Sequence, residues 1–286
     1  MQLPHRSLYT IPRLDAPAVL KRHGLRPNSK LGQNFLQSPE ALEAITFAAG
    51  IRPTDIVLEI GPGLGSLTRY LAVSAQQVVA VELDPNLLAP LSAVLAPYPN
   101  TRVIHGDILE LAVPDLITAE DYLVVANIPY YITSAIIRHL LESRPKPRRI
   151  VLTIQKEVAE RICEEPGDLS LLALSVQVYG KPHIAARIPA GAFYPAPQVD
   201  SAVLLVDIYP EPQIPIAGLP VFFRLIKAGF SQKRKTLRNS LSAGLHISTQ
   251  ESGSLLERAG IDPMRRAETL SLPEWSKLVD ELKPTG

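Results

Sequence analysis

The stretch DIVLEIGPGLGSLTRYLA, residues 55–72, contains the two signals that decide the fold. It begins as an apolar, β-branched run, passes through Gly61, Gly63 and Gly65, and continues with apolar residues at helical spacing. A strand that ends in glycines and turns directly into a helix leaves backbone N–H groups open to a ligand. The stretch therefore predicts the first strand and helix of an α/β domain, joined by a binding loop.

Strand and helix signals alternate after this loop. Four further near-continuous apolar runs predict buried strands, at residues 77–84, 101–107, 122–127 and 148–155. Val/Ile/Leu-rich strands that alternate with helices are typical of a parallel sheet covered by helices on both faces. Two later apolar runs, separated by a proline-containing loop, are expected to add an antiparallel edge; they lie at 181–189 and 201–209.

The segment at residues 209–220 is rich in proline and is typical of a linker. Only helical patterns follow it, so we expect a small all-α domain at the C-terminal end. We therefore predict three parts: an N-terminal extension (1–27), an α/β domain (28–210) and a helical domain (211–286).

Composition excludes several classes of protein. The 286 residues are 46% hydrophobic and 20% charged, as in folded globular proteins. No apolar run approaches the ~20 residues that a membrane-spanning helix needs. The single cysteine, Cys163, rules out an internal disulfide and fits a reducing compartment, and the six histidines lack metal-ligand spacing. We expect a cytoplasmic monomer that uses neither a metal nor a membrane.

The net charge of +1 hides an uneven distribution. Lys and Arg exceed Asp and Glu by three in residues 1–50 and by three in 211–286, whereas residues 51–210 carry a balance of −5. Two short cationic clusters lie at 144–149 and 231–238. One such cluster is often only solvated surface, but two of them together with basic ends favour a polyanion partner. The clustered cations are Arg144, Lys146, Arg148, Arg149, Lys233, Arg234, Lys235 and Arg238.

Acidic residues end the two strands that follow the glycine loop. Glu82 lies twenty-one residues after Gly61, and Asp107 ends the next strand. Ligands bind at the carboxyl ends of such strands, where an acid placed like Glu82 accepts hydrogen bonds from ribose hydroxyls. A dinucleotide would favour glycine or alanine at the position of Ser66. The pattern therefore favours S-adenosylmethionine over a dinucleotide, although a glycine-rich loop alone does not decide between them.

The fourth strand of the series ends in the polar, stiff tetrapeptide Asn127–Ile128–Pro129–Tyr130. The exocyclic amine of adenine is a poor nucleophile, and a site that accepts both of its N–H bonds directs the nitrogen lone pair at a methyl group. The side-chain oxygen of Asn127 and the backbone carbonyl of Ile128 can accept them, while Pro129 fixes the turn. Tyr130 offers a flat face for an unpaired base. In the alternative reading, Asn127 only caps the strand and Tyr130 packs on the core.

Together these motifs resemble the KsgA/RsmA family, the adenine dimethyltransferases of small-subunit ribosomal RNA. The resemblance runs over nearly the whole chain and implies a Rossmann-like class I methyltransferase domain followed by a small all-α domain that contacts RNA. The segments that carry it are KLGQNFL (30–36), EIGPGLGSLT (59–68), VELD (81–84), HGDIL (105–109), NIPYYI (127–132), QKEVAERI (155–162), FYPAPQVDSAV (193–203) and FSQKRKTLRNSL (230–241).

The resemblance also implies a reaction and its residues. The reaction is N6,N6-dimethylation of two adjacent adenosines in the 3′-terminal hairpin loop of 16S rRNA, within the assembling small subunit. Phe193 would lie on the face of the target adenine opposite Tyr130. The implied cofactor contacts are Asn34, Leu36, Gly61, Gly63, Glu82, Asp107 and Asn127.

The chain departs from the family in the loop at 164–170, which is shorter than in the relatives, so any substrate contact made there is in doubt. Two rival functions stay open. One is methylation of a single adenine in 23S rRNA, the macrolide-resistance type of reaction, and the other is a ribosome-assembly factor without catalysis. Ser66 makes a dinucleotide-dependent oxidoreductase the weakest alternative.

Overall fold

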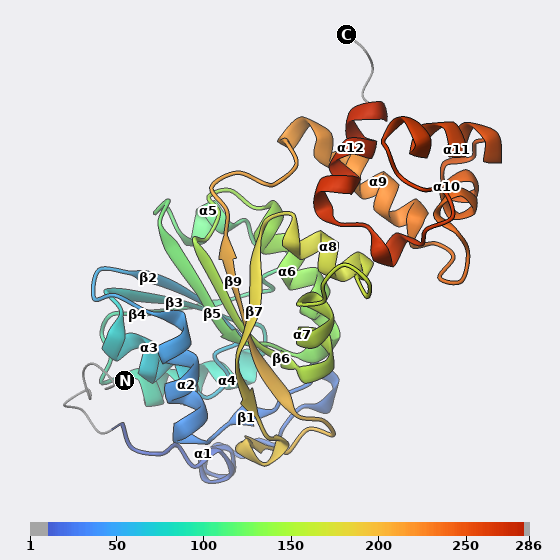
Figure 1. Ribbon diagram of the computed structural model, residues 1–286. Helices are drawn as coiled ribbons and strands as arrows, with labels where there is room; N and C mark the ends of the chain where they lie inside the picture. The colour runs from blue at the N-terminus through green and yellow to red at the C-terminus, as the bar shows by residue number, and fades with distance from the viewer. Residues whose placement is uncertain (1–10, 283–286) are drawn as a thin grey trace, which may run out of the picture. The chain divides into compact units, whose positions relative to one another are not determined.

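The computed structural model describes residues 11–282, so the first ten residues of the predicted N-terminal extension lie outside the described part (Figure 1). The chain forms two compact units. The first comprises the residues up to 156 together with 185–205, and the second comprises 157–184 together with the residues from 206 onward.

A seven-stranded sheet has the order β4-β3-β2-β5-β6-β9-β7. The pairs β2–β3, β2–β5, β3–β4 and β5–β6 are all parallel, as the buried apolar runs predicted. The strand order changes direction at β2, and at such a point the loops that follow neighbouring strands diverge and leave a crevice. The strands are β2 (Ile56–Ile60), β3 (Gln77–Glu82), β4 (Thr101–His105), β5 (Tyr122–Asn127), β6 (Arg149–Gln155), β7 (Gly180–Ile188) and β9 (Ser201–Ile208).

Both faces of the central strand β5 are buried. Leu123 and Val125 point to one face and join a core cluster with residues of α2 and α3, while Val124 on the other face is also fully buried. This is why the strand has a continuous apolar sequence instead of alternating apolar and polar residues. The helices of this unit are α1 (Ala16–Arg22), α2 (Pro39–Ala49), α3 (Ser66–Ser74), α4 (Pro85–Leu95), α5 (Val113–Leu116) and α6 (Thr133–Glu142).

Local sequence sets where α4 begins. Asp84 is its N-cap, and the carboxylate accepts a hydrogen bond from the backbone N–H of Asn86 at 3.0 Å. Pro85 follows at the first helical position, where its missing N–H costs nothing. These two features place the end of β3 directly beside the start of α4.

A second, two-stranded sheet holds the entry segment, residues 30–36. In it, β1 (Phe35–Leu36) pairs antiparallel with β8 (Phe193–Tyr194). Below it, Ala16 and Leu20 of α1 are buried in a cluster with Phe35 and Leu64. Part of the predicted N-terminal extension is therefore a helix that packs against the glycine loop.

The second unit is mainly helical, and its C-terminal part is all-helical as expected. Trp275 and Phe222 are fully buried at its centre. A Cβ on Gly244 would lie 2.5 Å from the Cα of Ala228, so α9 and α10 cross at a distance that only glycine allows. The helices are α7 (Lys156–Ile162), α8 (Leu171–Gln177), α9 (Leu219–Gly229), α10 (Leu237–Leu245), α11 (Thr249–Arg258) and α12 (Leu272–Leu282).

The shortened loop at 164–170 belongs to this second unit. The backbone N–H groups of Gly167 and Leu169 donate to the carbonyl of Glu268, at 3.0 and 3.2 Å. Residues 157–184 thus group with the C-terminal helices, although the sequence placed them in the α/β domain. Within residues 11–282, no helix has both the length and the apolar character needed to cross a bilayer.

Candidate active site

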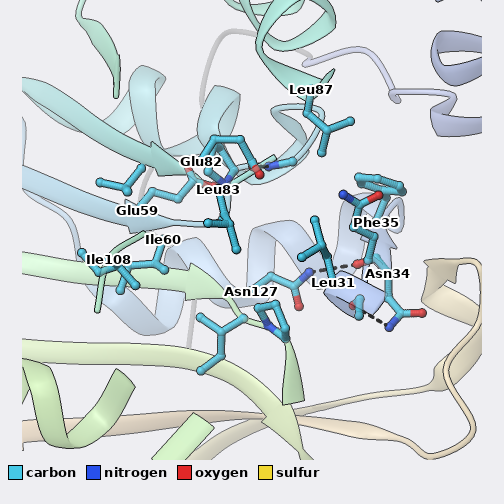
Figure 2. Close-up of a pocket in the computed structure, with 18 of the residues that line it drawn as sticks. Leu31, Asn34, Phe35, Glu59, Ile60, Glu82, Leu83, Leu87, Ile108 and Asn127 are labelled. Carbon is cyan, nitrogen blue, oxygen red and sulfur yellow. Dashed lines mark hydrogen bonds between the residues drawn. The ribbon is translucent and has the colours of Figure 1, made fainter. Parts of the chain in front are cut away.

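A pocket lies at the carboxyl ends of the central parallel strands, where the sequence placed the site (Figure 2). Segments far apart in the chain form its wall, and they include every predicted cofactor residue and the whole 127–130 tetrapeptide. These segments are residues 31–36, 59–64, 66–67, 81–83, 87, 106–108 and 127–132.

The glycine loop presents bare backbone to this pocket. Gly61 and Gly63 have φ values of +68° and +58°, which residues with a Cβ rarely adopt. A Cβ on Gly63 would also lie 3.1 Å from the ring of Phe35. The loop ends at Gly65, the N-cap of α3, which has no side chain to cap the helix. The first turn of α3 therefore keeps backbone N–H groups that a ligand can bind.

Glu82 is buried at the end of β3, with 5% of its surface exposed. One carboxylate oxygen accepts from the N–H of Gly63 at 2.9 Å, and the other accepts from the N–H of Asp84 at 2.8 Å. Each oxygen has a second lone pair, so both can also accept from the hydroxyls of a ribose. Burial raises the pKa of Glu82, and the two backbone hydrogen bonds oppose that rise.

Glu59 is a second buried acid in the pocket wall, and the sequence reasoning missed it. It is 1% exposed, and its Oε2 atom has no hydrogen-bond partner among the described residues. Burial, with a smaller contribution from the carboxylate of Glu82, raises the pKa of Glu59 to about 8. The available signal was an acid inside the otherwise apolar strand β2, where an ionised side chain is costly.

Asn127 is held by the entry segment. Its Nδ2 atom donates to the backbone carbonyl of Asn34 at 3.1 Å, and the Nδ2 atom of Asn34 donates to the carbonyl of Gly32 at 3.1 Å (Figure 2). The first bond fixes the orientation of the Asn127 amide, because the nitrogen must face Asn34. The Oδ1 atom is then available as a neutral acceptor.

Tyr130 is fixed at its polar end. Its hydroxyl lies 2.6 Å from the hydroxyl of Ser201, and burial raises the pKa of the tyrosine. The ring lines the pocket within the short helix η2 (Tyr130–Ile132). Ser201 lies in the 193–203 segment quoted above, but no local pattern predicted its contact with Tyr130.

The structure does not bring Phe193 to the pocket wall. Its side chain is 4% exposed and packs in the core cluster that contains Leu36 and Ile188. The pairing of Leu36 with Phe193 in the β1–β8 ladder explains this position. Stacking of Phe193 on an adenine has no support from this geometry and stays a prediction.

The first cationic cluster lies at the start of β6, at the amino end of that strand, whereas the pocket lies at the carboxyl ends of the strands. Arg148 is engaged there, with nitrogens 2.6 Å from Asp55 and 2.7 Å from Asp121, and Arg149 donates to the carbonyl of Ala49 at 3.2 Å. These contacts give Arg148 and Arg149 structural roles; Arg144 and Lys146 lie in the turn just before.

The second cluster has a different character. Lys233, Arg234 and Lys235 are exposed in the second unit, and Arg238 is half-buried in α10. Contact of either cluster with RNA stays a prediction. Across residues 11–282, no three side chains of the metal-binding types come together.

Comparison with known proteins identifies the chain's relatives. The family model described as ribosomal RNA adenine dimethylase matches residues 24–283. The ribosomal RNA small subunit methyltransferase A of Dehalococcoides mccartyi (strain CBDB1) is 49% identical over 266 residues, which cover 92% of this chain and 91% of the relative.

Solved structures agree. The 23S rRNA methyltransferase ErmE is similar with a TM-score of 0.70 and 29% identity, covering 87% of this chain and 99% of that one. A dimethyladenosine transferase from Plasmodium falciparum is similar with a TM-score of 0.73 and 27% identity, over 85% and 95% of the two chains. The family model and the relatives cover almost the whole length of the chain. They therefore include the mostly parallel sheet, the glycine loop and the tetrapeptide at the end of β5. The chain belongs to the ribosomal RNA adenine dimethylase family.

Proposed function

We propose that this protein uses S-adenosylmethionine to dimethylate the N6 amines of two adjacent adenosines in the 3′-terminal hairpin loop of 16S rRNA. The family supports adenine dimethylation, and a relative 49% identical is named a small-subunit methyltransferase. In this proposal the substrate is the assembling small subunit, and the protein acts on it as a monomer in the cytoplasm.

The pocket fits the cofactor in two observed respects. The buried carboxylate of Glu82 retains lone pairs for ribose hydroxyls, and the backbone of Gly61 and Gly63 can lie against a ligand without a side chain between them. Asp107 and the entry residues Asn34 and Leu36 complete the proposed contacts. When bound, S-adenosylmethionine supplies an electrophilic methyl group on a positively charged sulfur.

The hydrogen bond from Asn127 to Asn34 carries the proposal, because it leaves the Oδ1 atom of Asn127 as a neutral acceptor. In our proposal Oδ1 accepts one N–H bond of the adenine amine, and the backbone carbonyl of Ile128 accepts the other. The nitrogen lone pair then points at the methyl group. Catalysis rests on positioning and on these preorganised acceptors, and no strongly basic side chain is required.

The target adenine stacks on Tyr130 in this proposal. The base leaves its stack in the RNA, and contact with an aromatic ring is worth ~1–3 kcal/mol per base. The hydrogen bond to Ser201 holds the phenol end of Tyr130, so the ring does not need to be ordered when the base arrives. Pro129 limits the backbone between the two acceptors and the ring.

The proposed division of labour assigns the chemistry to residues 28–210 and RNA contact to residues 211–286. Exposed Lys233, Arg234 and Lys235 are the proposed phosphate contacts. The ion pairs of Arg148 make the cluster at 144–149 the weaker candidate, since RNA would have to compete with Asp55 and Asp121.

Likeness to ErmE supports one alternative, methylation of an adenine in 23S rRNA. The test is mass spectrometry of digested rRNA after the protein, S-adenosylmethionine and small subunits from a strain lacking the modification are mixed. N6,N6-dimethyladenosine at two adjacent 16S positions is the expected result. Methylation of large-subunit rRNA alone, in a parallel reaction, would support the ErmE-like alternative. Subunit binding without methyl transfer would indicate an assembly factor.

A further inference from the structure

Tyr131 follows the proposed stacking tyrosine and has a different environment. It is 62% exposed, whereas Tyr130 is half-buried, yet both line the same pocket. Of the exposed large apolar side chains among residues 11–282, only Leu83 and Tyr131 line the pocket, and Tyr131 is the one with a ring. An exposed ring is thus available at the rim.

The ring of Tyr131 lies next to Gly32 of the entry segment. The position that a Cβ would occupy on Gly32 lies 3.4 Å from its Cε1 atom and 3.5 Å from its Cδ1 atom. Gly32 has a φ of +62° and ends the short helix η1 (Ser29–Leu31). A side chain at residue 32 would therefore meet the ring. One edge of the ring thus lies beside the backbone of Gly32, while most of the side chain stays open.

Two cations lie on the entry segment or just before it in the chain. Lys30 precedes Gly32 by two residues and, together with Arg26 and Asp84, lines a second cavity that shares Leu87 with the pocket. Both cations are exposed, and neither forms an ion pair with another described residue. An exposed aromatic ring together with exposed cations in a nearby part of the chain is the combination that binds single-stranded nucleic acid without base-specific hydrogen bonds.

Single exposed apolar residues are common and need no function. Phe47 on α2 is an example: it is 67% exposed and does not line the pocket. Tyr131 differs because it adjoins, in the chain and in space, the residue on which the target base is proposed to stack. The next base of an RNA strand that enters the pocket has to pass this rim.

We infer that Tyr131 stacks on the base that neighbours the target adenosine, so that the site binds two consecutive unpaired bases, one on each tyrosine. This inference rests on the proposed function and adds a second base-binding position to it. Since the neighbouring base does not react, its stacking is equal before and during methyl transfer. Loss of the ring should therefore raise KM for the RNA substrate and leave kcat unchanged.

The test measures methylation of small subunits from a strain lacking the modification by wild type, Tyr131→Phe and Tyr131→Leu. Leucine keeps apolar packing against Gly32 but cannot stack. We expect Tyr131→Leu to raise KM for subunits roughly 5- to 150-fold, the range that corresponds to the loss of one base–aromatic stack. Tyr131→Phe should restore KM, and Phe47→Leu, the matched exposed control, should leave it unchanged.

Tyr131 could act by stacking on a base or by holding the entry segment in place. Cofactor affinity, measured by calorimetry with S-adenosylhomocysteine, distinguishes these two roles. Affinity that is unchanged in Tyr131→Leu supports stacking. Wild-type KM in Tyr131→Leu, or a loss of cofactor affinity that matches the loss of activity, would overturn the inference alone. No methyl transfer by the wild-type protein would overturn the proposed function and this inference with it.

Discussion

The Nδ2 atom of Asn127 lies 3.1 Å from the backbone oxygen of Asn34, a residue 93 positions earlier in the chain. This bond joins the end of a central strand to the entry segment. It also settles which end of the Asn127 amide is free for a substrate. The proposed cofactor contact and the proposed amine acceptor are therefore parts of one connected structure.

Replacing Asn127 with alanine should lower turnover about 10²- to 10³-fold, the usual loss when one preorganised hydrogen-bonding group is removed. The cofactor should bind within a few-fold of wild type, because its main proposed contacts are elsewhere. Single-turnover methylation and calorimetry measure the two quantities. Asn34→Ala keeps the backbone carbonyl that Asn127 needs but loses a proposed cofactor contact, so it should weaken cofactor binding more than it lowers turnover. Equal losses of turnover and cofactor affinity in Asn127→Ala would contradict the proposed role.

Glu82→Ala should weaken binding of S-adenosylmethionine roughly 10- to 150-fold. Hydrogen bonds to a charged group contribute about 1.5–3 kcal/mol, and this carboxylate also holds the N–H groups of Gly63 and Asp84 in place. Titration calorimetry gives the affinity. Glu43→Ala, an exposed acid on α2, should bind the cofactor like wild type. If Glu82→Ala also bound it like wild type, the ribose assignment would be refuted.

The buried acid Glu59 should make stability depend on pH. Its pKa is raised in the folded protein from 4.5 to about 8, so between these values the unfolded chain releases a proton that the folded chain keeps. The free energy of unfolding should then fall as pH rises, by about 1.4 kcal/mol per pH unit. Below pH 4.5 this contribution is fully present, and it is lost as pH rises through 8.

Glu59→Gln cannot titrate and should lack this decline. Thermal unfolding followed by circular dichroism at pH 5, 7 and 9 compares it with wild type. Other groups titrate in both proteins, so the difference between the two reports on Glu59 and its interaction with Glu82. We expect the stability of the variant relative to wild type to grow between pH 5 and pH 9. Parallel pH curves would show that Glu59 ionises normally.

Changing Lys233, Arg234 and Lys235 to glutamine should flatten the salt dependence of RNA binding and leave cofactor affinity unchanged. Each lost phosphate contact lowers the slope of log K against log salt by about 0.7–0.9. The measurement is subunit binding at several salt concentrations. A control variant removes the same charge from cations that are paired with carboxylates: Arg52, Arg138 and Arg258. Equal slopes for the two triple variants would place the RNA contacts elsewhere.

Features that depend on neighbouring residues in the chain were predictable from the sequence. The strand predicted at 122–127 coincides with β5, and Asp84 caps α4, because buried strands and helix ends follow local rules of polarity and hydrogen bonding. The family and the parallel sheet were confirmed. Assignment of the individual site residues stays a prediction, although the structure gathers all but Phe193 of the proposed catalytic and cofactor residues around one pocket.

What the sequence could not predict depends on contacts between distant residues. The bond between Tyr130 and Ser201 and the pairing of Arg148 with Asp55 join positions 71 and 93 residues apart. No pattern in the neighbouring sequence predicts either contact. From the sequence alone, Arg148 is indistinguishable from a free surface cation. The grouping of residues 157–184 with the C-terminal helices likewise depends on long-range packing.

The β1–β8 ladder is only two residues long on each side. A ladder this short has few hydrogen bonds, so the position of β1 depends mainly on the packing of Phe35 and Leu36, which are both buried. One wall of the pocket is therefore held by side-chain packing instead of by the ladder of a large sheet.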